Sequence, residues 1–194
     1  MSDPVLQSPL APLLSGGPRA LTVDGQAVSL GETALMDMLN LRGNPADPAF
    51  VAAVQAASGL ALPLSANTTT LGTDRQWLWL GPDEWLLQCT LGQGDALEAA
   101  LRSALAGQHM SVVSVGHGNS VLRLQGPGAA ALLSRGCPLD LHPRSFAAGQ
   151  MAQSHISRAN ATIVCREAGT HYEITVRRSF ADYLLRWLCA AAGA

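Results

Sequence analysis

The stretch between residues 116 and 141, GHGNSVLRLQGPGAAALLSRGCPLDL, places the tightest limits on how this chain can fold. Residues 120–125 are apolar enough for a strand, which Gly126-Pro127-Gly128 must interrupt. The proline fixes φ at a value that suits a first helical turn, so residues 129–134 are predicted to form a short helix. Gly136 is predicted to cap that helix in the left-handed conformation. The stretch predicts a strand, a turn and a helix as one local unit, and it indicates no function.

Two hairpins are predicted elsewhere in the chain. Asp24-Gly25 separates two short apolar runs, a pattern typical of a tight hairpin. Gly81-Pro82-Asp83 separates two longer runs in RQWLWLGPDEWLLQC and predicts a second strand-turn-strand unit. Residues 35–41 fit either a helix or a strand, and we favour a strand at 38–42. Further strands are predicted at residues 110–115, 120–125, 151–156, 161–165 and 172–176.

Three further helices are predicted, each with a polar residue at its start. Because hairpins outnumber crossovers and the helices stand singly, the predicted fold class is α+β with mixed, largely antiparallel sheets. A hairpin followed by a helix occurs in both halves and hints at a repeat. The expected helices lie between Asp47 and Gly59, over 94–106 with Asp95 and Glu98 as a capping box, and after Ser179 with Asp182.

The domain organisation is predicted from composition. Residues 1–18 contain four prolines and a Gly-Gly pair, and are expected to form an extended N-terminal arm. The arm is interpreted either as a mobile tail or as a segment laid on a partner. Residues 19–194 are expected to form one compact α+β unit, or two closely packed lobes of about 19–109 and 110–194.

Charge is unusually sparse. Hydrophobic residues make up 48% of the chain and charged residues 13%, against roughly 25% charged in an average soluble domain. This composition indicates either a surface that faces another protein or a compositional habit of an Ala-rich genome. The net charge of −2 argues against a nucleic-acid partner. The absence of lysine excludes a Schiff-base lysine and a Walker-type lysine.

The cysteines and the N-terminus indicate a reducing compartment. The four cysteines stand alone, without a CxxC pair. The N-terminus lacks the basic start and long apolar run of a secretory signal. No apolar segment approaches the roughly 18 residues needed to cross a bilayer. The sequence therefore predicts reduced thiols, a cytoplasmic location and no membrane partner.

No candidate site in the sequence is convincing. Cys137 with His117 or His142 could form a nucleophilic pair, but a Cys before Pro at a helix end is usually structural. Metal ligands lack two close pairs, and the glycine-rich turns lack the GxGxxG pattern of a dinucleotide loop. We therefore predict no catalytic, cofactor-binding or metal-binding residue in this chain. The remaining candidates weighed were His155, His171, Asp83, Glu84 and Asp140.

Five residues are predicted to contact a partner. Trp77 and Trp79 share a strand face, which suits either a core or a partner surface. Arg42 follows an apolar strand, and Arg177 and Arg178 stand between a strand and the terminal helix. These arginines are expected to pair with carboxylates, either across an interface or within the fold.

Four segments together carry a family resemblance: LNLRGNPADPAF, LGPDEWLL, LQGPGAAALLSRGCPLDLHPRSFAAGQMAQ and YEITVRRSFADYLLRWL. They closely resemble the gamma subunit of heterotetrameric sarcosine oxidases. The resemblance implies a fold similar to the first domain of folate-dependent aminomethyltransferases. It also implies a subunit without an active site, acting in assembly and stability of an oxidoreductase complex that oxidatively demethylates sarcosine.

The resemblance further implies large flavoprotein partner subunits that hold FAD, FMN, NAD and tetrahydrofolate, with no cofactor in this chain. An isolated chain is expected to self-associate through the surface its partners would cover. Two alternatives stay open. The chain could be a self-sufficient folate-binding or aminomethyltransferase-like protein, or the small subunit of an N-methylglutamate-oxidising complex.

Overall fold

The structure is a computed structural model that describes residues 6–194, so residues 1–5 of the predicted arm lie outside the described residues. The described residues group into two compact units. Unit 1 consists of residues 6–35, 119–147 and 154–194. Unit 2 consists of residues 36–118 and 148–153.

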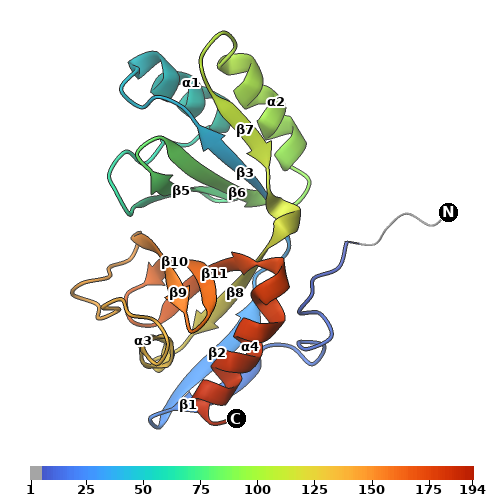
Figure 1. Cartoon of the computed structure of the whole chain (residues 1–194), viewed down its shortest axis with the longest axis vertical. Helices are drawn as coiled ribbons and strands as arrows, with labels where there is room; N and C mark the ends of the chain where they lie inside the picture. Colours follow the sequence, from blue (N-terminus) through green and yellow to red (C-terminus); the bar gives the residue numbers. More distant parts are fainter. Residues whose placement is uncertain (1–5) are drawn as a thin grey trace, which may run out of the picture. The chain divides into compact units, whose positions relative to one another are not determined.

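Unit 2 is a five-stranded sheet with two helices on one face (Figure 1). The strand order is β4-β5-β6-β3-β7, and all neighbouring strands are antiparallel. Helix α1 starts as predicted, because Asp47 Oδ1 accepts from the Ala49 N–H at 2.9 Å, and Gly59 ends it in the left-handed conformation. The elements are β3 (Met36–Arg42), α1 (Pro48–Ser58), β4 (Thr69–Leu71), β5 (Arg75–Gly81), β6 (Glu84–Thr90), α2 (Gly94–Ala104), β7 (Ser111–Ser114) and the 3₁₀ turn η1 (Gly116–Gly118).

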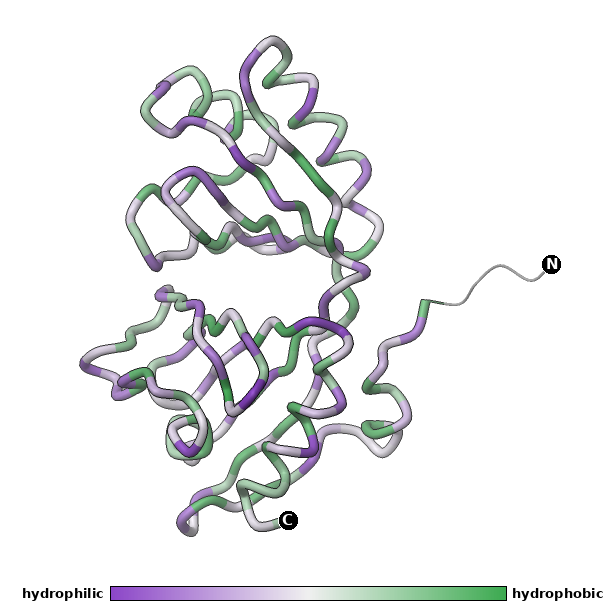
Figure 2. The backbone as a smooth tube through the Cα atoms, viewed as in Figure 1, coloured by the Kyte–Doolittle hydropathy of each residue, from purple (hydrophilic) through white to green (hydrophobic). Residues whose placement is uncertain are grey.

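The core of unit 2 lies between its sheet and its helices. Successive strand residues point to opposite faces, so alternate residues of β3 and β6 meet the apolar sides of α1 and α2. Figure 2 shows hydrophobic and hydrophilic residues interleaved along these elements. The buried cluster is Leu39, Leu41, Phe50, Val54, Leu62, Trp77, Trp85, Leu87, Cys89, Leu97, Leu101, Leu105 and Val112.

Unit 1 is a six-stranded sheet in the order β1-β2-β8-β11-β10-β9. The Asp24-Gly25 turn joins β1 and β2 as predicted, and β2 then pairs antiparallel with β8. Helix α4 packs against β1, β8 and β11, and α3 packs against α4. The elements are β1 (Arg19–Val23), β2 (Gln26–Glu32), β8 (Asn119–Gln125), α3 (Ala129–Ser134), β9 (Met151–Ile156), β10 (Ala159–Glu167), β11 (His171–Arg177) and α4 (Arg178–Ala192).

The two units repeat one arrangement. In unit 2 the sheet contains the order β5-β6-β3-β7, and in unit 1 it contains β10-β11-β8-β2. A helix follows the central strand and another follows the hairpin in each unit. The difference lies in the last strand: unit 2 uses β7, which follows its second helix, whereas unit 1 uses β2 from the N-terminal part of the chain. Both units are largely antiparallel, which confirms the predicted α+β class.

Three predicted helix caps are wrong. Helix α2 has no side-chain cap from Asp95; the carboxylate of Asp37 in β3 instead accepts from the N–H of Gly94, the first helical residue, and from the N–H of Gly92 just before the helix. Helix α4 begins at Arg178, so Ser179 lies inside the first turn, and Asp182 pairs with Arg186 at 2.7 Å. The backbone of Gly136 lies outside the left-handed region. Strand β4 was not predicted, because its polar sequence carries no apolar alternation.

Candidate functional site

The two tryptophans predicted to face a partner have different environments. Trp77 in β5 is fully buried, and its Nε1–H donates to Ser58 Oγ at 3.2 Å. Trp79, two residues later, is partly buried against the same core. Trp77 thus packs inside unit 2, which is the core alternative that the strand pattern left open. Contact between Trp79 and a partner stays a prediction.

Arg42 lies at the rim of an open pocket of about 670 Å³ in unit 2. Its Nη2 contacts Asp83 Oδ2 at 2.7 Å, and both side chains are about half exposed (53% and 55%). This hydrogen bond, and then the carboxylate's charge, raise the pKa of the guanidinium, so Arg42 stays cationic. Three loops meet here: the one after β3, the β5–β6 turn and the one before β7. The lining residues are Arg42, Gly43, Asn44, Pro45, Asp83, His109, Met110 and Ser111.

Arg178 contacts the N-terminal arm. Its Nη2 donates to the Gln7 carbonyl oxygen at 2.7 Å, and the Ser8 hydroxyl donates to Glu32 at 2.5 Å. Leu10 is fully buried and anchors the segment. Burial raises the pKa of Glu32, although the Ser8 hydrogen bond and the charge of Arg178 oppose that rise. Residues 6–18 therefore lie on unit 1 of the same chain.

Arg177 precedes α4 and is exposed. It makes no side-chain cap to the helix that follows it. Its role in binding a partner stays a prediction.

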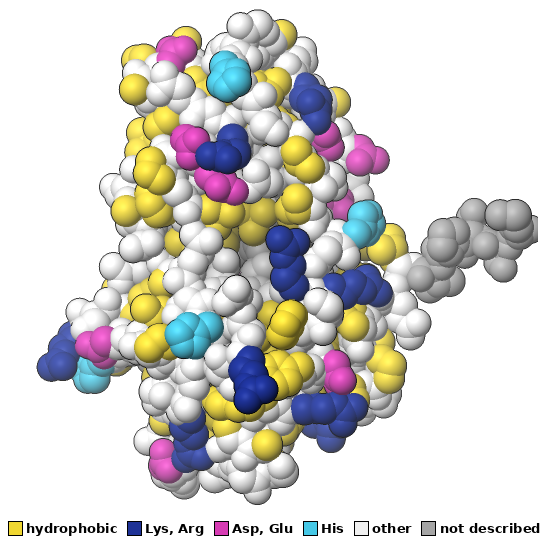
Figure 3. Space-filling view, viewed as in Figure 1, with side chains coloured by type: hydrophobic (Ala, Val, Ile, Leu, Met, Phe, Trp, Pro, Cys, Tyr) yellow, Lys and Arg dark blue, Asp and Glu magenta, His cyan; other side chains and the backbone are white. Residues whose placement is uncertain are grey.

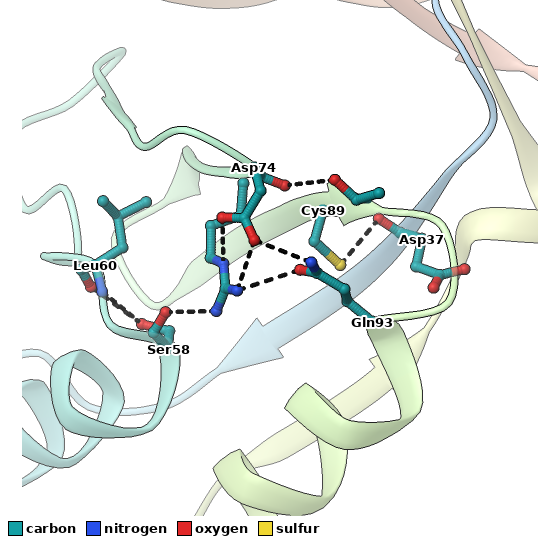
Figure 4. Close-up of polar contacts among 8 residues, drawn as sticks. Asp37, Ser58, Leu60, Asp74, Cys89 and Gln93 are labelled. Atoms are coloured by element: carbon teal, nitrogen blue, oxygen red, sulfur yellow. Dashed lines mark hydrogen bonds and ion pairs between the residues drawn. The ribbon is translucent and has the colours of Figure 1, made fainter.

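A polar network joins the end of α1 to the start of α2 (Figure 4). Arg75 forms a bidentate pair with Asp74, at 3.0 and 2.9 Å, and also donates to the Ser58 carbonyl oxygen at 2.9 Å. The side-chain amide of Gln93 donates to Asp74 and accepts from Arg75. These hydrogen bonds lower the pKa of Asp74 to about 2. Each charged group already has partners within unit 2, so the network acts as a brace between the two helices.

Burial makes the thiols of Cys89 and Cys165 poor candidates for nucleophilic catalysis. Burial, followed by the negative charge of Asp37, raises the pKa of Cys89 to about 11, and burial also raises the pKa of Cys165. Cys137 is buried, and its sulfur lies 3.9 Å from Ser154 Oγ. His142, one of its suggested partners, instead accepts at Nδ1 from the Arg144 N–H. The structure thus records no Cys137–imidazole hydrogen bond among the described residues.

The Gly-Pro-Gly turn is needed for packing. A Cβ on Gly126 would lie 2.4 Å from the Ala27 carbonyl oxygen, and the φ of Gly126 is +124°. The Gly126 N–H donates to the Thr170 carbonyl and the Gly128 N–H to the Ala27 carbonyl. Pro127 has no N–H to offer. These N–H groups are therefore not available to cradle a phosphate.

The remaining carboxylate and histidine candidates have local roles or stand apart. Asp140 accepts hydrogen bonds from the Ser145 hydroxyl and the His142 N–H, which lower the pKa of its carboxyl group. Glu84 accepts from the Asn40 amide at 2.8 Å. Over residues 6–194, no three His, Cys, Asp or Glu side chains are grouped as a metal site would require. No helix in the same range is long and apolar enough to cross a membrane.

Sequence reasoning weighed Asp83 but missed the remaining members of the Arg42 pocket and the brace around Arg75. Asn44 follows the end of β3, and His109 and Ser111 lie just before and at the start of β7. The sequence signal was the position of these polar residues beside strand ends. Which strand ends lie next to one another is known only from the strand order β5-β6-β3-β7.

Comparison with solved structures supports the predicted fold. The chain is similar to a chain of the heterotetrameric sarcosine oxidase from Corynebacterium sp. U-96, with a TM-score of 0.86, 32% identity and coverage of 97% of this chain and 95% of that one. It is also similar to glycine cleavage system aminomethyltransferase T from Bartonella henselae, with a TM-score of 0.59, 19% identity and coverage of 82% and 44%. The second likeness shows the fold alone, and it confirms the predicted similarity of fold to an aminomethyltransferase.

Sequence comparison identifies the family. The chain is 34% identical over 194 residues to the sarcosine oxidase subunit gamma of Corynebacterium sp. (strain U-96), covering 98% of this chain and 91% of that protein. It is 32% identical over 167 residues to the corresponding subunit of Arthrobacter sp., covering 85% and 80%. Residues 42–194 match the model described as the sarcosine oxidase, gamma subunit family. The chain belongs to the sarcosine oxidase gamma subunit family.

Proposed function

We propose that this chain is the gamma subunit of a heterotetrameric complex that oxidatively demethylates sarcosine, and that it acts in the assembly and stability of that complex. The observation that carries the proposal is the match, over nearly the whole of both chains, to a chain of a heterotetrameric sarcosine oxidase. The partners are the large flavoprotein subunits of the same complex.

The cofactors belong to the partner subunits in this proposal: FAD, FMN, NAD and tetrahydrofolate. Two features of this chain argue against binding of the phosphate groups of FAD, FMN and NAD. Its Gly-Pro-Gly turn uses both glycine N–H groups in backbone hydrogen bonds. The chain has no lysine for a phosphate. We therefore assign no catalytic step to this chain.

The surface supports a role in assembly. Charged residues make up 13% of the sequence, and Figure 3 shows them in a few small groups among uncharged side chains on the face it presents. Large apolar side chains are also exposed, and a partner would remove them from water. An isolated chain should self-associate for the same reason. The exposed large hydrophobic residues are Leu6, Leu64, Leu71, Leu91, Val113 and Phe180.

The state of the cysteines supports a cytoplasmic complex in this proposal. All four are free, and three of them are buried. Free thiols persist in reducing compartments.

Co-expression tests the proposal. The full chain, produced with the large subunits encoded beside it, should co-purify with them in a defined ratio. Omitting it should lower the yield or stability of the complex and leave the flavin chemistry unchanged in any complex that forms. Purified alone, the chain should be colourless and should not oxidise sarcosine. Failure to co-purify, or a yellow isolated chain with amine-oxidising turnover, would reject the proposal; folate bound to the isolated chain would favour the aminomethyltransferase-like alternative.

A further inference from the structure

We propose that the Arg42 pocket of unit 2 receives an acidic side chain of a partner subunit, with Arg42 as the residue that binds its carboxylate. This inference rests on the proposed function, because it names a contact by which the gamma subunit joins its complex.

The walls of the pocket are fixed before any partner arrives. The Gly43 N–H donates to the Asp83 carbonyl oxygen at 3.1 Å, which ties the β5–β6 turn to the end of β3. Asn44 Oδ1 accepts from the Ala46 N–H at 3.0 Å, and Asp47 then caps α1. On the opposite side, Arg102 donates to the Val112 carbonyl and holds the strand that follows His109. A preformed site costs little ordering entropy when it binds.

Arg42 has N–H donors that the contact with Asp83 does not use. A guanidinium carries five N–H groups in a planar fork, and the contact with Asp83 uses one nitrogen of Arg42, Nη2. An exposed ion pair of this kind holds its two side chains together only weakly. The pair therefore does not prevent a second carboxylate from approaching the free edge of the fork, where a bidentate contact can form.

The pocket favours an acidic group over a basic one. Donor groups predominate in its lining: the Arg42 guanidinium, the Asn44 amide and the Ser111 hydroxyl. The one acidic lining residue, Asp83, is already hydrogen-bonded to Arg42, and the nearby carboxylate of Glu84 accepts from the Asn40 amide. Pro45 and Met110 add apolar surface that the methylene groups of an Asp or Glu side chain can cover. Arginine paired with a carboxylate at the centre of a desolvated contact is a common source of binding energy.

Charge reversal gives the first test. Arg42→Glu in the full chain, co-expressed with the large subunits, should weaken association by about tenfold or more, since it places like charges together. Arg186→Glu is the matched control, because Arg186 is also exposed (64%) and also pairs with one carboxylate at 2.7 Å. The control should assemble within about twofold of wild type, consistent with the small effect of an exposed pair.

Arg42→Gln is a second variant that keeps the test valid if Arg42→Glu misfolds. Its amide can still donate to Asp83 while the charge is lost, so it should keep the thermal unfolding of wild type and still weaken assembly. Added salt should weaken the wild-type complex more than the Arg42→Gln complex.

The absence of lysine permits a direct second test. In an Arg42→Lys, Asp83→Asn chain, the introduced amine is the only lysine ε-amine. A carbodiimide activates a carboxyl group, and an adjacent amine then forms an amide while the reagent leaves as a urea. This reaction should join the chain to a partner subunit. Mass spectrometry of the product should identify a partner Asp or Glu. Arg186→Lys in an Asp182→Asn chain should give no such product.

The outcomes separate the inference from the proposed function. If wild type fails to co-purify with the large subunits, the proposed function and this inference both fail. If wild type assembles, and Arg42→Glu and Arg42→Gln assemble equally well without a cross-link from position 42, only the inference fails. An equal loss in Arg42→Glu and Arg186→Glu would also overturn it, because the effect would then be one of net charge.

Discussion

The carboxylate of Asp37, in strand β3, accepts hydrogen bonds from the N–H groups of Gly92 at 2.7 Å and Gly94 at 2.9 Å, at the start of helix α2. The first N–H groups of a helix have no partner within the helix. A residue more than 50 positions earlier in the chain thus supplies the cap of α2. The approach leaves no room for a side chain at position 94, because a Cβ on Gly94 would lie 2.8 Å from the Asp37 side chain.

Replacing Asp37 should destabilise the isolated chain. Asp37→Ala is expected to lower the free energy of unfolding by about 1–2 kcal/mol, the usual cost of a lost helix cap. Asp37→Asn should lose less, since its side-chain oxygen still accepts. Asp95→Ala removes the residue that the sequence suggested as the cap, and should change stability little. Urea titrations would measure all three, and an Asp95→Ala loss as large as that of Asp37→Ala would contradict the assignment.

Gly136 should not tolerate a side chain. A Cβ at this position would lie 2.3 Å from the indole ring of Trp187, so the end of α3 could no longer pack against α4. Gly136→Ala is expected to cost about 1–3 kcal/mol, as overpacking does. Gly16→Ala is the control, because no atom lies within 4 Å of a Cβ there. Adding Trp187→Phe should recover part of the loss; a fully stable Gly136→Ala chain would show that the packing is looser than described.

Stability should fall at alkaline pH through Tyr172. Burial raises the pKa of this phenol from an ordinary 10 to about 12, so folding favours the neutral form. The resulting stabilisation is complete below pH 10 and is lost as the pH rises towards 12. Cys89 contributes a loss in the same direction above pH 9, since its pKa is also raised.

Tyr172→Phe tests this dependence. At neutral pH it should cost about 1 kcal/mol, because the Leu141 carbonyl oxygen loses its hydrogen-bond donor. Between pH 10 and 12 the variant should lose less stability than wild type. Identical slopes for wild type and Tyr172→Phe in denaturant titrations across this range would show that another group is responsible.

The N-terminal arm should loosen when Arg178 is removed. Arg178→Ala breaks the hydrogen bond to the Gln7 carbonyl oxygen and leaves Glu32 without the nearby positive charge. Amide hydrogen exchange of Leu10, Leu13 and Leu14, whose N–H groups are hydrogen-bonded, should quicken by roughly tenfold. Arg177→Ala is the matched control and should leave exchange unchanged. Equal protection in wild type and Arg178→Ala would mean that burial of Leu10 holds the arm without help from Arg178.

The sequence alone determined the local elements of this protein. Asp24-Gly25 predicts its hairpin, Asp47 and Gly59 predict the ends of α1, and Gly81-Pro82-Asp83 predicts the turn between β5 and β6. Each of these signals involves residues a few positions apart, whose backbone preferences act before any tertiary contact forms. The chain-long resemblance added the family, which no local signal could supply.

Only the tertiary structure decided which distant segments contact one another. β2 completes the sheet of unit 1 beside β8, Asp37 caps α2, and Arg178 binds the arm at Gln7. Gly136 is required by Trp187 rather than by its own backbone, and the pocket at Arg42 exists only where three loops meet. These partners are separated by tens to more than a hundred residues, and neither periodicity nor capping preference records which distant group will fill a position. Packing of the sheets and helices makes that choice, because it brings together the groups whose hydrogen bonds and volumes must be satisfied at once.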